Sequence, residues 1–117
     1  MPSAVNLSEK LKLIEGHWKP KIVSTFNGHD ILIVKVKGEF IWHKHDDTDD
    51  FFYVLSGSIN IETEQGNVTL NPGELFVVPK GIQHRPIAQE EAHLLVIEKE
   101  GTPNTGDPKT AVIKEKI

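Results

Sequence analysis

Hydrophobic and polar residues alternate over short runs along most of the chain, and this period of two is typical of β-strands. Turn-forming residues interrupt the runs at short intervals, as in Asn27-Gly28, a dipeptide favoured in tight hairpins. We expect a second hairpin with Gln65-Gly66-Asn67 at its tip. The runs that we interpret as strands are KIVSTF, DILIVKVKG, FFYVLSG, SINIETEQGNVTL, ELFVVP and AHLLVIEKEG. Regularly spaced strands without helices between them predict an antiparallel sandwich or small barrel.

A helical pattern occurs in one segment, residues 6–14. Asn6 can cap this segment and Glu9 follows three residues later, but the helix would cover only about two turns. The last residues, 101–117, are rich in turn formers, and the sequence PNTG within them predicts a turn that fixes a C-terminal arm. We therefore expect one domain over residues 1–117, with an N-terminal arm at 1–20, a barrel at 21–100 and the C-terminal arm at 101–117.

Strand parity divides residues 40–45 and 50–55 into two sets that lie on opposite faces. Strands that are apolar on both faces are usually covered on both. Because both sets contain large apolar side chains, we expect a homodimer whose interface includes Trp42 and Tyr53. The set expected to face inward is Ile41, His43, His45, Asp50, Phe52 and Val54, and the other set is Phe40, Trp42, Lys44, Phe51, Tyr53 and Leu55.

Composition narrows the possible partners and chemistry. The 117 residues carry a net charge of −4 without clustered Lys and Arg, which argues against nucleic acid as a partner. The absence of cysteine excludes disulfides and thiolate ligands, so a metal site must use histidine and carboxylate. No apolar run has the length of a membrane span, and the first residues lack the apolar stretch of a signal peptide. We expect a cytoplasmic protein without a membrane partner.

Histidines and acidic residues gather in the segment FIWHKHDDTDDFFYVLSG, residues 40–57. His43 and His45 lie two residues apart and share one face of a predicted strand, and Asp50 has the same parity. A turn containing Pro79 and Gly81 precedes His84, which could reach the same interior. These four side chains suit a divalent transition metal such as Zn, Mn, Fe, Ni or Co.

A simpler interpretation of this segment is a polar loop in which the histidine pair bonds to neighbouring aspartates. We expect that interpretation to hold for Asp46, Asp47 and Asp49, which would lie in solvent. Asp49 is the alternative to Asp50 as a ligand, but its parity is opposite to that of Phe52. The metal site would then comprise His43, His45, Asp50 and His84.

Two motifs in the chain resemble those of the cupin superfamily. The first is Gly38, His43, His45, Asp50 and Gly57, and the second is Gly73, Pro79, Gly81 and His84, with Ala88 where the family usually has asparagine. The chain as a whole also resembles a group of small single-domain cupins of unassigned function, the mannose-6-phosphate isomerase-like group. The resemblance implies an all-β fold, an antiparallel double-stranded β-helix (the jelly-roll barrel) with a short N-terminal helix or turn, and a metal at the barrel centre.

Asp50 departs from the family pattern, which usually has glutamate, because its side chain is one methylene shorter. Three alternatives stay open: Asp50 reaches the ion, it acts through a water molecule, or three histidines hold the metal alone.

The resemblance leaves the reaction open. A metal-dependent isomerase, lyase or dioxygenase would use the ion as a Lewis acid or oxygen-binding centre on a small polar molecule such as a sugar, keto acid or diketone. A non-catalytic module that binds or senses a small ligand, with or without metal, is the alternative. A cupin that has lost its ion because Asp50 is too short is a third. His93, near the start of the last predicted strand, is a candidate to point into the barrel behind the ligands or to carry a proton.

Overall fold

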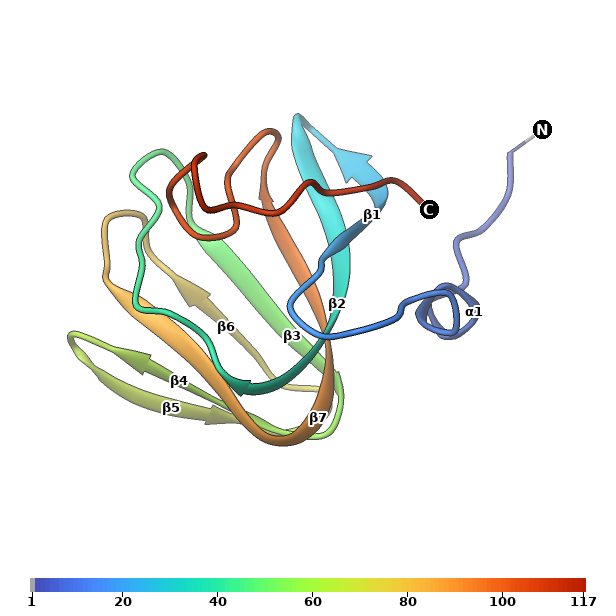
Figure 1. The fold of residues 1–117 in the computed structure, drawn as a ribbon. Helices are drawn as coiled ribbons and strands as arrows, with labels where there is room; N and C mark the ends of the chain where they lie inside the picture. Colours follow the sequence, from blue (N-terminus) through green and yellow to red (C-terminus); the bar gives the residue numbers. More distant parts are fainter. Residues whose placement is uncertain (1) are drawn as a thin grey trace.

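The chain folds into a curled antiparallel β-sheet, which confirms the predicted all-β jelly-roll class (Figure 1). The computed structural model describes residues 2–117. Its elements are α1 (Leu7–Leu11), β1 (Lys21–Phe26), β2 (His29–Glu39), β3 (Asp50–Ser56), β4 (Ile59–Thr63), β5 (Gly66–Leu70), β6 (Leu75–Val78) and β7 (His84–Lys99). No helix among these residues is long and apolar enough to cross a bilayer.

Helix α1 forms within the predicted segment but covers only five residues. Asn6 caps it as expected, since the backbone N–H of Glu9 donates to Asn6 Oδ1 at 2.9 Å. Leu7 and Leu11 pack against a small cluster formed by Ile14, Val23 and Ile33. The helix therefore lies outside the barrel and ties the N-terminal arm to β1 and β2 (Figure 1).

Strand β7 organises the sheet because it pairs with β2, β3 and β4. Its sixteen residues begin at His84, well before the strand that the sequence predicted from residue 92. The polar residues 89–91 resemble a loop in the sequence, but they form a bulge between the pairs Gly38–Ala88 and Val36–Ala92. A bulge bends a strand without ending it. This bend lets one long strand pair with β4 in its first half and with β3 in its second.

The tight turns occur close to their predicted positions. Asn27 and Gly28 join β1 to β2 with φ angles of 49° and 74°, as a two-residue hairpin requires. The β4–β5 hairpin closes one residue earlier than predicted, because Thr63 pairs with Gly66 and leaves Glu64 and Gln65 as the turn. Gly66 is therefore the first residue of β5 rather than part of the tip.

Interior parity is confirmed in β3 and fails at Ile41. Asp50, Phe52 and Val54 are buried as predicted, whereas Ile41 is 53% exposed and does not face inward. Residues 40–49 form no continuous strand, and only His43 bridges to another strand, at His84. Because this segment has no row of backbone hydrogen bonds to a neighbouring strand, the alternation of faces does not extend from His43 back to Ile41.

The C-terminal arm runs across one end of the barrel and returns to the first strand (Figure 1). Lys116 forms a parallel bridge with Ile22, and the Ile117 N–H donates to the Ile22 carbonyl at 3.0 Å. The turn predicted at PNTG is present, since the Gly106 N–H donates to the Pro103 carbonyl at 3.0 Å. These contacts tie the end of the arm to β1, and Gly106 packs against the backbone of Lys44 in the loop that carries His43 and His45.

Candidate metal centre

Four side chains that the sequence predicted as ligands meet inside the barrel. His43 and His45 come from the loop between β2 and β3, Asp50 begins β3, and His84 begins β7. All four are buried, and one ligand atom from each lies within 4.8 Å of the others. Asp50 Oδ2 lies 3.3 Å from His45 Nε2 and 3.4 Å from His84 Nε2. The shorter side chain of aspartate is therefore long enough to join the three imidazoles.

Backbone hydrogen bonds hold the two halves of the cluster together. The N–H of His43 donates to the His84 carbonyl at 3.0 Å, and the His84 N–H donates to the His43 carbonyl at 2.8 Å. The Gly81 N–H donates to the His45 carbonyl at 2.7 Å, so the turn that precedes β7 is tied to the same loop. Asp49 lies outside the cluster, where its Oδ1 accepts from the Lys80 N–H.

Two of the imidazoles have a defined orientation. His43 Nδ1 donates to the Ile41 carbonyl at 2.8 Å, and His84 Nδ1 donates to the Ile82 carbonyl at 2.9 Å. A proton on Nδ1 leaves the lone pair on Nε2, which is the arrangement that metal-binding histidines use. The backbone therefore selects the tautomer in which both rings can ligate a cation.

The cluster contains two buried polar atoms that no group in residues 2–117 satisfies, His45 Nδ1 and Asp50 Oδ1. An unsatisfied buried carboxylate oxygen is costly, and each such atom in a folded protein calls for an explanation. A cation at the centre of the four side chains would satisfy Asp50. Three imidazoles and one carboxylate are also a ligand set that divalent transition metals accept.

The protonation states at the cluster differ among its members. Burial, together with repulsion from the neighbouring histidines, lowers the pKa of His43 to about 4, so this ring is neutral at pH 7. Burial alone would lower the pKa of His45 and raise that of Asp50. Their mutual hydrogen bond and charges outweigh burial, so the pKa of His45 is raised and that of Asp50 is lowered. A cation that binds these two groups competes with the proton on His45.

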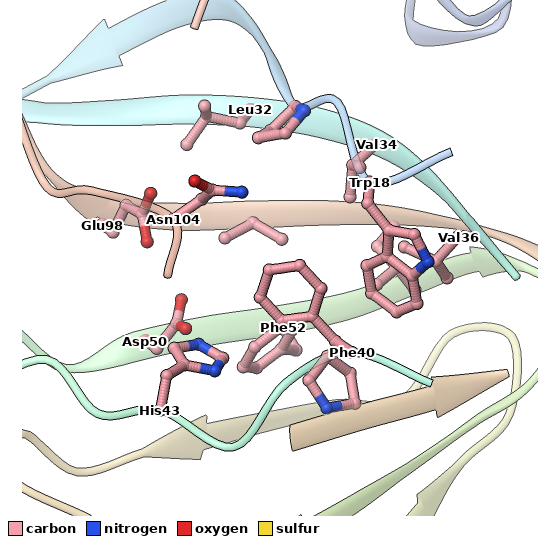
Figure 2. A pocket seen from close by; sticks show the side chains of 14 residues that line it. Trp18, Leu32, Val34, Val36, Phe40, His43, Asp50, Phe52, Glu98 and Asn104 are labelled. Carbon is pink, nitrogen blue, oxygen red and sulfur yellow. The ribbon is translucent and has the colours of Figure 1, made fainter. Parts of the chain in front are cut away.

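A cavity of about 60 Å³ adjoins the cluster and brings in residues that sequence reasoning missed (Figure 2). Glu98, near the end of β7, is buried and lines this cavity with His43 and Asp50. Burial and the charge of Asp50 raise the pKa of Glu98 to about 7, although Lys114 Nζ donates to its carboxylate. Glu98 lies on the same face of β7 as the buried residues Leu94 and Val96, so the alternation of faces along this strand could have identified it. No local pattern marks Lys114.

His93 does not occupy the position considered for it. It lies on the outer face of β7, between the buried residues Ala92 and Leu94, which point inward. Its Nε2 lies 3.1 Å from Glu91 Oε2, and the other carboxylate oxygen of Glu91 lies 2.8 Å from His17 Nε2. The prediction that His93 could serve the cluster is wrong, because the bulge at residues 89–91 sets the parity of the strand that follows.

Comparison with known proteins agrees with this architecture. The family model for the cupin domain, Cupin_2, matches residues 31–98. A cupin-2 domain protein from Shewanella frigidimarina is 41% identical, with a TM-score of 0.80 over 82% of this chain and 94% of that one. Protein NMB1881 from Neisseria meningitidis is 30% identical, with a TM-score of 0.76 over 84% of this chain and 100% of that one.

A further relative is the uncharacterized protein YdbB of Bacillus subtilis, which is 33% identical over 64 residues. That alignment covers 54% of this chain and 57% of YdbB. Hydroquinone 1,2-dioxygenase PnpCD, solved in complex with Cd²⁺ and 4-hydroxybenzonitrile, is 17% identical with a TM-score of 0.70, a likeness that concerns the fold alone. Since the family model spans more than half of the chain and the Shewanella relative superposes over most of it, this protein belongs to the cupin superfamily.

Proposed function

We propose that His43, His45, Asp50 and His84 hold one divalent transition metal, which is Zn, Mn, Fe, Ni or Co. This metal would bind or act on a small organic ligand in the adjoining cavity. The observation that carries this proposal is the convergence of four buried ligand atoms within 4.8 Å, one of them from a carboxylate with an unsatisfied oxygen. When bound, the metal would act as a Lewis acid or as an oxygen-binding centre.

Catalysis by a metal-dependent isomerase, lyase or dioxygenase is the first candidate within this proposal. Glu98 supports it, because a carboxyl whose pKa is raised to about 7 can exchange a proton near neutral pH at the wall of the cavity. The Nδ1–H groups of His43 and His84 donate to backbone carbonyls, and these bonds hold the two rings in place. The apolar remainder of the cavity limits water around the ligand.

A module that binds or senses a small ligand without turning it over is the alternative. The ion pair between Glu98 and Lys114 favours it, because a carboxylate held by a buried ammonium is less free to exchange a proton. Loaded protein, tested under air and under nitrogen on sugars, keto acids and diketones, separates the two candidates. Turnover supports the enzyme, and retention of metal without turnover on any of these compounds supports the module.

The metal itself is tested by elemental analysis of protein purified without chelator. We expect close to one metal ion per chain, lost in His43→Ala and in His84→Ala. His93→Ala is the matched control, because this histidine lies on the outer face of β7 and should leave the metal content unchanged. Substoichiometric metal that is the same in all four proteins would contradict the proposal.

We also propose that the protein is a homodimer. The support is an apolar strip on the outer face of β3 and the edge strand β6, where Leu75 is 54% and Val77 is 38% exposed. Tyr53 pairs with Leu75 on the same face. Light scattering coupled to gel filtration should report twice the chain mass, and the variant Leu75→Glu should lower it. A monomeric mass for the unaltered protein would refute this.

A further inference from the structure

The cavity beside the cluster has an uneven distribution of polarity. At one end lie the polar side chains His43, Asp50, Glu98 and Asn104, and the rest of the wall is hydrocarbon (Figure 2). Among residues 2–117, neither Lys nor Arg lines this cavity. Its volume of about 60 Å³ corresponds to the space of about four to six water molecules. The aliphatic and aromatic walls include Leu32, Val34, Val36, Phe52, Leu94 and Val96.

This distribution disfavours sugars and phosphates. A buried hydroxyl without a hydrogen-bond partner loses its hydration, and most of this wall offers no partner. Away from the proposed metal, a phosphate or carboxylate group would find no arginine or lysine on the cavity wall to neutralise it. The cavity instead suits a compact ligand that is apolar along most of its length.

Two aromatic rings, Phe40 beside His43 and Trp18 beyond it, continue the wall away from Asp50 and Glu98 (Figure 2). Trp18 stacks on Phe40 with ring centroids 4.9 Å apart, and Phe40 meets the His43 ring edge-on at 5.2 Å. Trp18 has a φ angle of 62°, which is strained for a residue with a side chain. Its backbone N–H donates to the Lys35 carbonyl and its indole N–H to the Lys37 carbonyl, each at 2.9 Å. These two bonds hold the indole against the cavity despite the strain.

Asn104 brings a fixed donor to the polar end from the C-terminal arm. The N–H of Val112 donates to Asn104 Oδ1 at 3.0 Å, which sets the orientation of the side-chain amide because an N–H can bond only to its oxygen. The amide nitrogen then points toward the interior of the cavity, as Figure 2 shows. No hydrogen bond within residues 2–117 uses this nitrogen, so it is available to an oxygen of the ligand.

We propose that this cavity selects compact, largely apolar molecules that carry an oxygen-bearing polar group at one end, with Asn104 donating to an oxygen of that group. The inference rests on the proposed function, because this polar group would be presented to the metal held by the four-residue cluster. The apolar body would lie along the aliphatic wall toward Phe40 and Trp18. Asn104 is thus a positioning residue supplied by the arm that closes the barrel.

Two chelators of equal size test this inference on zinc-loaded protein. Butyrohydroxamate and its isostere with a terminal hydroxyl in place of the methyl have the same metal-binding group and differ only in the polarity of the far end. We expect butyrohydroxamate to bind about tenfold more tightly, measured by calorimetry with zinc content checked afterwards. In a Trp42→Phe background, where Trp18 is the remaining tryptophan, binding should also change the tryptophan fluorescence.

The variant Asn104→Asp isolates the donor. A carboxylate oxygen can still accept from the Val112 N–H, so the arm stays in place, but the group that faces the ligand becomes an acceptor. Both chelators should bind about tenfold or more weakly while the affinity for zinc is unchanged. Failure to bind zinc would overturn the proposed function and this inference together. Zinc bound normally, with equal affinities for the two chelators or no effect of Asn104→Asp, would overturn this inference alone.

Discussion

Replacement of Gly106 by alanine should weaken both the fold and the proposed metal centre, because this glycine packs against the backbone between two of the proposed ligands. A Cβ atom at position 106 would overlap the carbonyl oxygen of Lys44, and Lys44 lies between His43 and His45. Gly106 also has a φ angle of +79°, where an alanine is strained. A backbone carbonyl cannot rotate aside as a side chain can, so the arm or the ligand loop must move.

Gly101 provides a matched control for this substitution. Its φ angle is +82°, and nothing lies within 4 Å of the Cβ that alanine would add. Gly101→Ala should therefore cost only the backbone strain, about 1–2 kcal/mol of the free energy of unfolding. Gly106→Ala adds an overpacking cost of about 1–3 kcal/mol, for a total of about 2–5 kcal/mol.

Urea unfolding of the metal-free proteins measures the loss of unfolding free energy in Gly106→Ala and in Gly101→Ala. The comparison holds if the slope of this free energy against urea concentration is the same in both variants and in the unaltered protein. Metal titration then reports the displacement of the ligand loop, and we expect an affinity about 10–100-fold lower in Gly106→Ala and unchanged in Gly101→Ala. Equal unfolding free energies and equal metal affinities for the two variants would refute the inference that the C-terminal arm packs against the loop that carries His43 and His45.

Three further predictions concern the buried groups. In metal-free protein the pKa of His43, lowered to about 4, makes the folded state bind fewer protons than the unfolded state, so stability should rise between pH 4 and 6.5. This change in the free energy of unfolding, up to about 3 kcal/mol, should be absent from His43→Gln when urea unfolding is measured over the same pH range. The same pH dependence in the variant and the unaltered protein would contradict the lowered pKa of His43. Leu94→Ala should cost about 2–5 kcal/mol because this side chain is 1% exposed, whereas Leu13→Ala, at 64% exposed, should change stability by under about 0.5 kcal/mol; similar losses would contradict the core assignment. Lys114→Met should destabilise the protein more at pH 8 than at pH 5, because Glu98 without its partner must be protonated to remain buried; an equal loss at both pH values in thermal unfolding would argue against this ion pair.

The strands and the four clustered side chains could be predicted because local patterns encode them. Alternation identified the inward set of β3, and the same parity distinguished Asp50 from Asp49, which the structure places outside the cluster. The same alternation gave the wrong face for Ile41. This residue does not pair with a neighbouring strand, and side chains alternate between two faces only where backbone hydrogen bonds hold the segment in a sheet. At His93 the sequence left the facing of the side chain open, because the bulge of β7 sets the faces of the residues that follow.

By itself, the sequence determined that this chain forms an antiparallel barrel with a pair of histidines, an aspartate and a third histidine on its inner faces. Those properties follow from periodicity, turn residues and spacing, which act over a few residues. The residues that surround the cluster, in contrast, could be identified only from the folded structure. Glu98 faces the cavity from β7, whereas Trp18, Asn104 and Lys114 come from the two arms that fold back over the barrel, and such contacts depend on packing between segments far apart in the chain.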